Sequence, residues 1–167
     1  MEYKHTLPIG AKLQSPKRVY TIERVLGQGG FGITYKVSAK IKVENVTVRT
    51  YFAIKEFFMS DSCERDNNNS ICYSSPVKDK VEEGKADFYA EAQRLNKISL
   101  NHSNLIHVNE VFEANNTVYY VMEYLDGGSL RSYVHKHKHR PLSEEKALEF
   151  MLPIMKAGDV LHQNRMT

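Results

Sequence analysis

The residues best suited to chemistry are a glycine-rich turn and a lysine that follows it. The turn reads Gly27-Gln28-Gly29-Gly30-Phe31-Gly32, and the lysine is Lys55, which ends the run Ala53-Ile54-Lys55. A glycine has no Cβ, so its backbone amide can approach a phosphate closely, and a lysine one hairpin later adds a positive charge. This arrangement predicts a clamp for the phosphates of a nucleotide.

Two other classes of nucleotide-binding loop fit the sequence less well. In a dinucleotide-binding unit the third glycine opens a helix, and an acidic residue follows about twenty residues later. Here a strand-like run follows the glycines, and the corresponding positions, Phe52 to Lys55, hold no acid. The phosphate loop of the other large class needs Gly-Lys-Ser/Thr, which the sequence lacks. A strand-turn-strand loop is the pattern that remains.

The elements that must position these residues follow from hydrophobic periodicity. Strand-like runs are expected at residues 19–26, 33–37, 48–57, 105–112 and 117–124. The first two make the glycine turn a hairpin. In the third, alternation places Ala53 and Lys55 on one face. A helix is expected from Val81 to Ile98, with Glu91 beside its apolar stripe, and a further helix is expected to begin at Ser143 with acidic residues in its first turn.

Composition limits the remaining possibilities. The 167 residues are 41% hydrophobic and carry a formal charge of +3, which allows one ordinary core and does not favour nucleic acid as a partner. No apolar run approaches the length of a membrane span, so a cytoplasmic location is expected. Cys63 and Cys72 are expected to be free thiols. Lysines interrupt the histidines of residues 135–139, which argues against a metal site there.

Four ordered motifs resemble the N-terminal lobe of a protein kinase, closest to the eukaryotic-like serine/threonine kinases of bacteria. They are residues 26–35, residues 52–55, Glu91 and residues 121–130 (Val-Met-Glu-Tyr-Leu-Asp-Gly-Gly-Ser-Leu), and the resemblance covers nearly the whole chain from Leu13. It implies an α+β fold with a five-stranded antiparallel sheet and one αC-type helix, followed by the first two helices of an incomplete C-lobe.

The same resemblance implies a division of the chain. Residues 1–12 form an N-terminal extension, residues 13–125 form the N-lobe, with an insertion at about 60–80, and residues 126–167 form the hinge exit and the first C-lobe helices.

The resemblance also assigns roles. Lys55 and Glu91 become the catalytic pair, in which Lys55 binds phosphates and Glu91 orients its ammonium group. Leu26 and Ala53 would enclose the adenine, and Met122 would limit the depth of the pocket. The residues implied to bind ATP are Leu26, Gly27, Gln28, Gly29, Gly30, Phe31, Gly32, Thr34, Ala53, Lys55, Met122, Glu123 and Leu125. Glu123 and Leu125 would do so through their backbones, and Thr34 replaces the valine usual in the motif.

Protein kinases also need a His-Arg-Asp loop and an Asp-Phe-Gly aspartate that holds Mg²⁺, and neither motif occurs in these 167 residues. We therefore expect a truncated kinase domain that binds ATP weakly and is inactive alone, with Mg²⁺ and a protein substrate bound only by the complete enzyme. The apolar side of the last helix (Phe150, Met151, Ile154) is expected to favour self-association. The alternative is a non-catalytic, kinase-like interaction or regulatory module.

Overall fold

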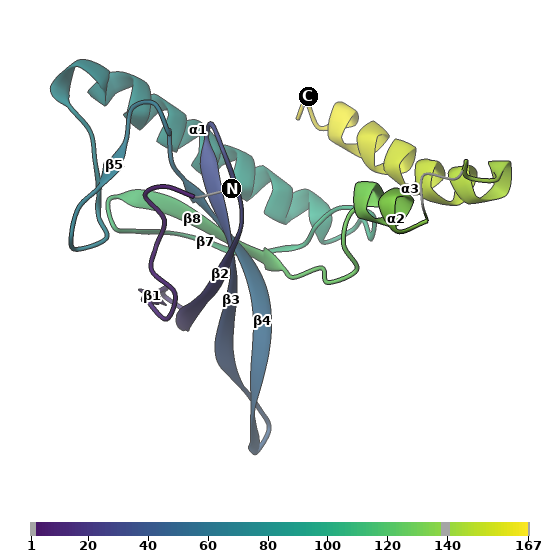
Figure 1. The fold of residues 1–167 in the computed structure, drawn as a ribbon, viewed down its shortest axis with the longest axis horizontal. Coiled ribbons are helices and arrows are strands. Elements are labelled where there is room, and N and C mark those ends of the chain that lie inside the picture. Colours follow the sequence, from purple (N-terminus) through teal and green to yellow (C-terminus); the bar gives the residue numbers. More distant parts are fainter. Residues whose placement is uncertain (1–2, 138–140, 167) are drawn as a thin grey trace.

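The computed structural model describes residues 3–137 and 141–166. It has an α+β architecture in which one antiparallel sheet is packed against a long helix, α1 (Lys78–Ser99), while helices α2 (Leu130–Lys136) and α3 (Glu144–Gln163) lie beyond one end of the sheet (Figure 1). The α+β fold expected from the sequence is confirmed.

The described part of the sheet has six strands in the order β1-β2-β3-β4-β8-β7, and all neighbours are antiparallel. The strands are β1 (Lys12–Gln14), β2 (Val19–Gly29), β3 (Gly32–Val43), β4 (Val46–Phe57), β7 (Val108–Ala114) and β8 (Thr117–Glu123). All five predicted strands are present. The sixth, β1, was not predicted, because three residues are too few for alternation to be read from the sequence.

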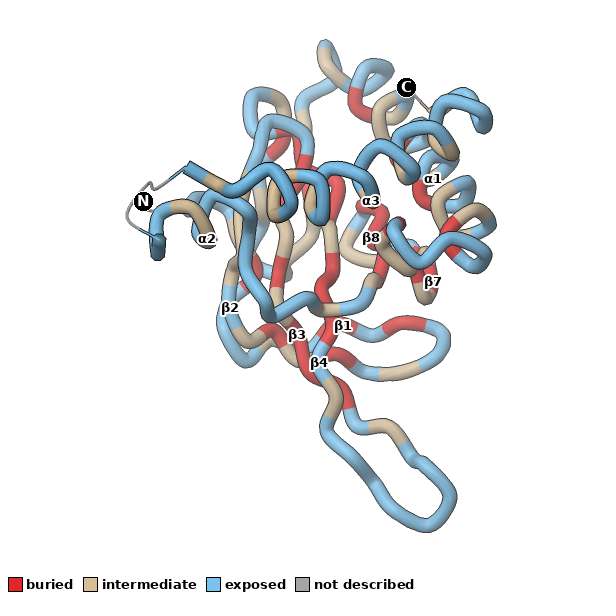
Figure 2. Tube along the Cα trace, turned by 90° about the vertical axis from the view of Figure 1, so that its right-hand side faces the viewer, coloured by how far each residue is buried: buried red, intermediate tan, exposed pale blue. Residues whose placement is uncertain are grey.

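The hairpin of β3 and β4 is much longer than predicted. The sequence indicated strands at 33–37 and 48–57, whereas the two strands stay paired as far as Val43 and Val46, and only Glu44 and Asn45 connect them. The end of the hairpin extends below the rest of the lobe, and its residues are exposed (Figures 1 and 2).

Helix α1 begins at Lys78, after a 3₁₀ turn (Ser75–Val77), and therefore takes in residues that were predicted to belong to the insertion. It buries Val81, Phe88 and Ala92, as the periodicity predicts, and Phe88 packs between the rings of Phe57 and Tyr120. The helix therefore covers the face of the sheet where β4 and β8 lie side by side.

Both later helices begin at a serine cap. The hydroxyl oxygens of Ser129 and Ser143 accept hydrogen bonds from backbone N–H groups in the first turns of α2 and α3. Helix α2 contains His135 and Lys136, while positions 138 and 139 of the histidine-lysine run lie outside the described residues. None of the helices described here is long and apolar enough to cross a membrane.

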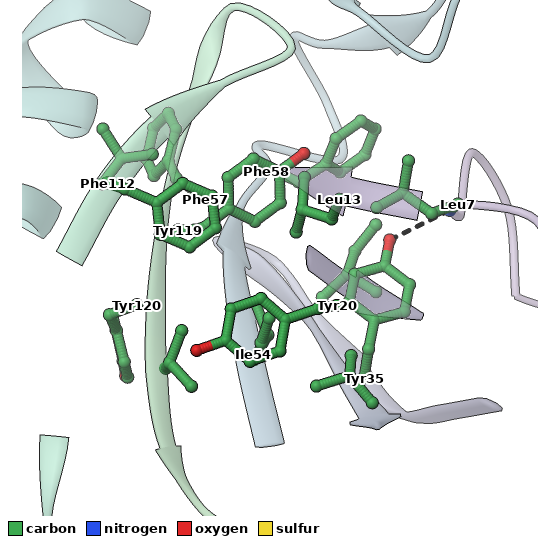
Figure 3. Packing of buried hydrophobic residues seen from close by; sticks show 14 of the residues in the cluster. Leu7, Leu13, Tyr20, Tyr35, Ile54, Phe57, Phe58, Phe112, Tyr119 and Tyr120 are labelled. Atoms are coloured by element: carbon green, nitrogen blue, oxygen red, sulfur yellow. Dashed lines mark hydrogen bonds between the residues drawn. The ribbon is translucent and has the colours of Figure 1, made fainter. Parts of the chain in front are cut away.

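The core is rich in aromatic residues (Figure 3), and several of its tyrosines bind buried carboxylates. The hydroxyl of Tyr20 donates to Glu110, and those of Tyr35 and Tyr119 donate to Glu56. Such groups are tolerated in a core because each has hydrogen-bonding partners.

The insertion is folded against the lobe. It forms a small hairpin of β5 (Glu64–Arg65) and β6 (Ile71–Cys72), and the guanidinium of Arg65 reaches into the core. That group donates to the Glu56 carboxylate at 2.6 Å, to the His5 carbonyl at 2.7 Å and to the Asn69 carbonyl at 2.8 Å. Arg65 thus ties together the insertion, the N-terminal residues and β4.

Candidate functional site

The glycine-rich residues form the turn between β2 and β3, as predicted. Gly29 and Gly32 are opposite each other in the register, so Gly30 and Phe31 make the connection. The turn is tethered to the end of β4, since the N–H of Phe58 donates to the carbonyl of Phe31 at 3.4 Å and the N–H of Ser60 donates to that of Gly30 at 3.2 Å.

The glycines of the turn are needed for different reasons. A Cβ on Gly32 would lie 2.8 Å from the carbonyl oxygen of Glu56, so this glycine allows β3 to pack closely on β4. A Cβ on Gly27, Gly29 or Gly30 would meet no protein atom within 4 Å. The open space beside these three positions leaves their backbone accessible to a ligand.

The strand register brings several of the predicted site residues onto one face of the sheet. Thr34 is directly opposite Lys55, and Ala53 is directly opposite Met122. Side chains of directly opposed residues lie on the same face, and alternation places Ala53 on the same side as Lys55. The four side chains therefore share the face on which alternation had placed Ala53 and Lys55.

Three further predicted residues lie at the margins of this face. Leu26 is the extra residue at a β-bulge of β2, where the register shifts between Val25 and Gly27, and bulges often re-aim side chains next to binding sites. Glu123 ends β8, and its carboxylate accepts a hydrogen bond from the N–H of His107 at 3.0 Å. Leu125 follows the strand and is 65% exposed.

Lys55 and Glu91 lie beside the same hollow, of about 410 Å³, but they do not touch. The ammonium group of Lys55 lies 5.5 Å from the ring centroid of Phe88 and 5.7 Å from that of Tyr120. Both distances are in the range of a cation–π interaction. Among the described residues no ion pair joins Lys55 to Glu91. The structure brings the pair to one hollow, with aromatic rings in contact with the lysine.

Two acidic residues beside Lys55 were missed by sequence reasoning. Glu83 and Asp87 line the hollow together with Glu91. The three are spaced by four along α1, and residues four apart share a helix face, so their spacing was the available signal. Gly84 lies among them, where a Cβ would come within 3.0 Å of the Phe57 ring. This glycine allows α1 to approach the end of β4.

The charge of Glu91 acts on the neighbouring residue Tyr120. Burial raises the pKa of its hydroxyl to about 12, and the negative charge of Glu91 adds to the shift. Glu91 is an exposed residue, yet its charge acts on a side chain in contact with Lys55. The carboxylate and the ammonium group therefore belong to one electrostatic environment.

A metal site is not formed by the described residues, which contain no group of three or more His, Cys, Asp or Glu side chains able to hold an ion. This part of the chain therefore offers no complete set of ligands for Mg²⁺.

Comparison with known proteins gives consistent results. Residues 20–167 match the family model described as protein kinase domain. The chain is 27% identical over 148 residues to serine/threonine-protein kinase D1044.8 of Caenorhabditis elegans, covering 87% of this chain and 14% of that protein. It is 28% identical over 146 residues to serine/threonine-protein kinase Nek3 of Mus musculus, covering 87% and 23%.

A bacterial protein is also similar. The probable serine/threonine-protein kinase PknB of Lactococcus lactis is 32% identical over 79 residues, which cover 47% of this chain and 12% of that protein. The chain thus spans less than a quarter of the length of these relatives. Among solved structures, the one described as "PpkA-294 apo form" shares the fold with a TM-score of 0.77 at 23% identity, covering 96% of this chain and 53% of that one.

Proposed function

Because this chain belongs to the protein kinase family, we propose that it is the ATP-binding portion of a serine/threonine protein kinase. The observation that carries the proposal is the placement of Thr34, Lys55, Ala53 and Met122 on one face of the sheet next to the glycine turn, with Glu91 beside the same hollow as Lys55. In the complete enzyme, this portion would hold ATP while the γ-phosphate is transferred to a protein serine or threonine.

The residues divide into those that hold the base and those that hold the phosphates. Leu26, Ala53 and Met122 would pack against the adenine, and the backbones of Glu123 and Leu125 would bind its edge. The accessible backbone of residues 27–32 and the ammonium group of Lys55 would bind the phosphates, because oriented amides and a fixed positive charge both stabilise a polyanion.

Glu91 would act on Lys55 only after a movement of α1. The ammonium group now rests against Phe88 and Tyr120, and the carboxylate lies at the same hollow without contact. A shift of the helix toward β4 would allow an ion pair that orients the ammonium toward the phosphates. The movement would pack Phe88 more closely, so nucleotide binding and helix position would be coupled.

Phosphate transfer requires more than these residues provide. The positioned aspartate and the metal-binding aspartate of kinases are absent from the 167 residues, and together such groups account for many powers of ten in rate. We expect these residues alone to bind ATP weakly and to transfer phosphate negligibly. Mg²⁺ and the protein substrate would be bound by the complete kinase, which we place in the cytoplasm.

Self-association through α3 is part of the same proposal. Five large apolar side chains of this helix are exposed: Leu148, Met151, Leu152, Ile154 and Met155. Phe150, expected to be among them, instead packs against Tyr133 of α2 at 5.2 Å between ring centroids. An apolar face of this kind favours contact between two copies of the chain.

The test is calorimetric titration of the 167-residue chain with ATP and, separately, with adenosine. We expect a dissociation constant for ATP in the range of about 1 µM to 1 mM. The variant Lys55→Met should weaken ATP binding by about tenfold, since it removes charge-assisted hydrogen bonds to phosphate, and should leave adenosine binding within about twofold.

The matched control is Lys97→Met, which removes an exposed lysine in the last turn of α1, outside the residues that line the hollow. It should leave both affinities unchanged. The proposal would be overturned by an absence of ATP binding at millimolar concentration, or by equal ATP affinities for the parent chain and Lys55→Met.

A further inference from the structure

The end of the β3–β4 hairpin has two open edges. The pairing of β3 with β2 stops at Ser38, and the pairing of β4 with β8 stops at Phe52. From there to the turn, residues 39–43 and 46–51 pair only with each other, and no other backbone hydrogen bond is made by these two described segments. The backbone groups on the outer side of each segment can therefore accept an additional strand.

The geometry of the turn shows which groups face outward. Val43 and Val46 flank a two-residue connection and so form a hydrogen-bonded pair. Because such pairs alternate with non-hydrogen-bonded pairs, Lys42 opposite Thr47 and Lys40 opposite Arg49 direct their N–H and C=O groups away from the hairpin. On β3, the outward backbone groups therefore belong to Lys40 and Lys42.

The two faces of this ribbon differ in chemistry. Lys40, Lys42 and Arg49 lie on one face, because opposed and alternate residues share a side. The other face carries Val43, Val46 and Val48, which are 56%, 62% and 45% exposed. Lysines on an edge strand commonly protect it against aggregation with other chains. The exposed valines on the opposite face do not fit that purpose and are typical of a surface that a partner covers.

A hollow lies next to the basic edge where β2 diverges from β3. Its volume is about 570 Å³, and its polar lining consists of Lys12, Lys40, Arg49, Thr21 and Ser38. The ammonium group of Lys12 donates to the Thr21 hydroxyl at 2.6 Å, and Arg49 forms an ion pair with Glu23 at 2.5 Å. Lys40 and Lys42 have no ion-pair partner among the described residues, so the hollow and the edge beside it carry excess positive charge.

We propose that the outer edge of β3 from Lys40 to Lys42 binds an extended acidic segment of another protein, which adds to the hairpin as a further strand. Its backbone would pair with the outward groups of Lys40 and Lys42, and carboxylates at every second position would lie over the lysines and the hollow. A second copy of this chain does not fit, because antiparallel pairing of two such edges would oppose lysine to lysine.

The probe is a synthetic peptide of alternating glutamate and valine with blocked ends, added to the 167-residue chain. A matched peptide carries lysine in place of glutamate, and a second carries N-methyl groups on alternate residues, which remove its N–H donors and keep its charge. We expect the acidic peptide to shift the amide resonances and slow the hydrogen exchange of Lys40 and Lys42. Each matched peptide should bind at least about tenfold more weakly.

Two variants locate the site on the protein. Lys40→Glu combined with Lys42→Glu should weaken binding of the acidic peptide by at least about tenfold, while Lys97→Glu, at an exposed position on α1, should change it less than about twofold. Amide spectra report whether each variant is folded. The proposal would be overturned if the acidic peptide did not bind, or if its N-methylated form bound equally well. It would also be overturned if the chain bound phosphatidylserine vesicles but not the acidic peptide.

Discussion

Arg65 and Glu56 form a buried ion pair that fastens the inserted hairpin to the sheet. Their nitrogen and oxygen atoms are 2.6 Å apart, and their side chains are 5% and 0% exposed. Glu56 follows Lys55 directly on β4, and successive side chains of a strand point to opposite faces. The Glu56 carboxylate therefore anchors β4 on the face of the sheet opposite to the one that carries the Lys55 side chain.

This pair predicts a large loss of stability in the variant Arg65→Met. The Glu56 carboxylate would keep the hydroxyls of Tyr35 and Tyr119 as donors but would lose its only charged partner within the described structure. Removal of one member of a buried pair leaves an uncompensated charge and costs about 3–5 kcal/mol. Urea unfolding followed by circular dichroism measures the change.

The matched control is Arg49→Met, which breaks an ion pair with Glu23 whose arginine side chain is 58% exposed. Exposed pairs contribute at most about 1 kcal/mol, so this variant should unfold close to the parent. Equal losses in the two variants would contradict the anchoring role of Arg65.

The glycine turn predicts that two similar substitutions differ in their effect on stability. Gly32→Ala places a methyl group 2.8 Å from the Glu56 carbonyl and should destabilise the chain by about 1–3 kcal/mol. Gly30→Ala meets no protein atom within 4 Å and should change stability by less than about 0.5 kcal/mol, while it weakens ATP binding. Thermal unfolding and ATP titration of both variants test this. A loss of stability in the Gly30→Ala variant would show that the turn has no room for a methyl group at this position.

The buried tyrosines predict a loss of stability at alkaline pH. Burial, together with the charge of Glu91, raises the pKa of Tyr120 from 10.0 to about 12, and burial also raises the pKa values of Tyr20, Tyr35 and Tyr119. The folded chain keeps these protons after the unfolded chain has released them. The stabilisation is therefore fully present below about pH 10 and decreases as the pH rises toward 12, by at most about 1.4 kcal/mol per pH unit for each tyrosine.

Tyr120→Phe isolates one of these contributions, since the hydroxyls of Tyr20, Tyr35 and Tyr119 bind buried carboxylates, whereas the pKa of Tyr120 is raised by burial and by the charge of Glu91 without such a hydrogen bond. Its urea midpoint should fall less steeply than that of the parent between pH 10 and pH 12. The absorbance of tyrosinate gives the titration directly. If the urea midpoints of the parent and of Tyr120→Phe fell equally steeply with pH, Tyr120 would be ruled out as a contributor.

The exposed face of α3 predicts reversible self-association of the chain. Leu152→Glu with Met155→Glu places charges in that face, at positions 49% and 64% exposed, and should give a monomer at concentrations where the parent is dimeric or larger. Sedimentation velocity measures this. A parent chain that stays monomeric at high concentration would contradict it.

The sequence predicted the elements whose patterns are local. The five main strands, the buried stripe of α1 and the cap at Ser143 followed from alternation, helical spacing and capping chemistry. The end of the β3–β4 hairpin was missed because residues 42–47 are all exposed, and so their pattern carries no signal of burial.

The site was predicted less completely because it depends on tertiary distances. The glycine turn and Lys55 were visible from their types and spacing. Whether Glu91 contacts Lys55 depends on where α1 rests, which spacing along one helix does not define. Arg65 was missed for a related reason, since a charged residue in a polar segment gives no sign of the buried carboxylate that receives it.

Residues 5–13 pack against the sheet and extend the core of the lobe toward the N-terminus. Leu7 and Leu13 are as buried as the strands behind them, and the Leu7 amide donates to the hydroxyl of Tyr35 at 3.1 Å, yet the family match begins only at residue 20. A chain trimmed to that match would lose the carbonyl that His5 offers Arg65 and would open one side of the tyrosine-carboxylate network to water. Residues 5–13 therefore belong to the packed core of the lobe, although they precede the residues that match the family.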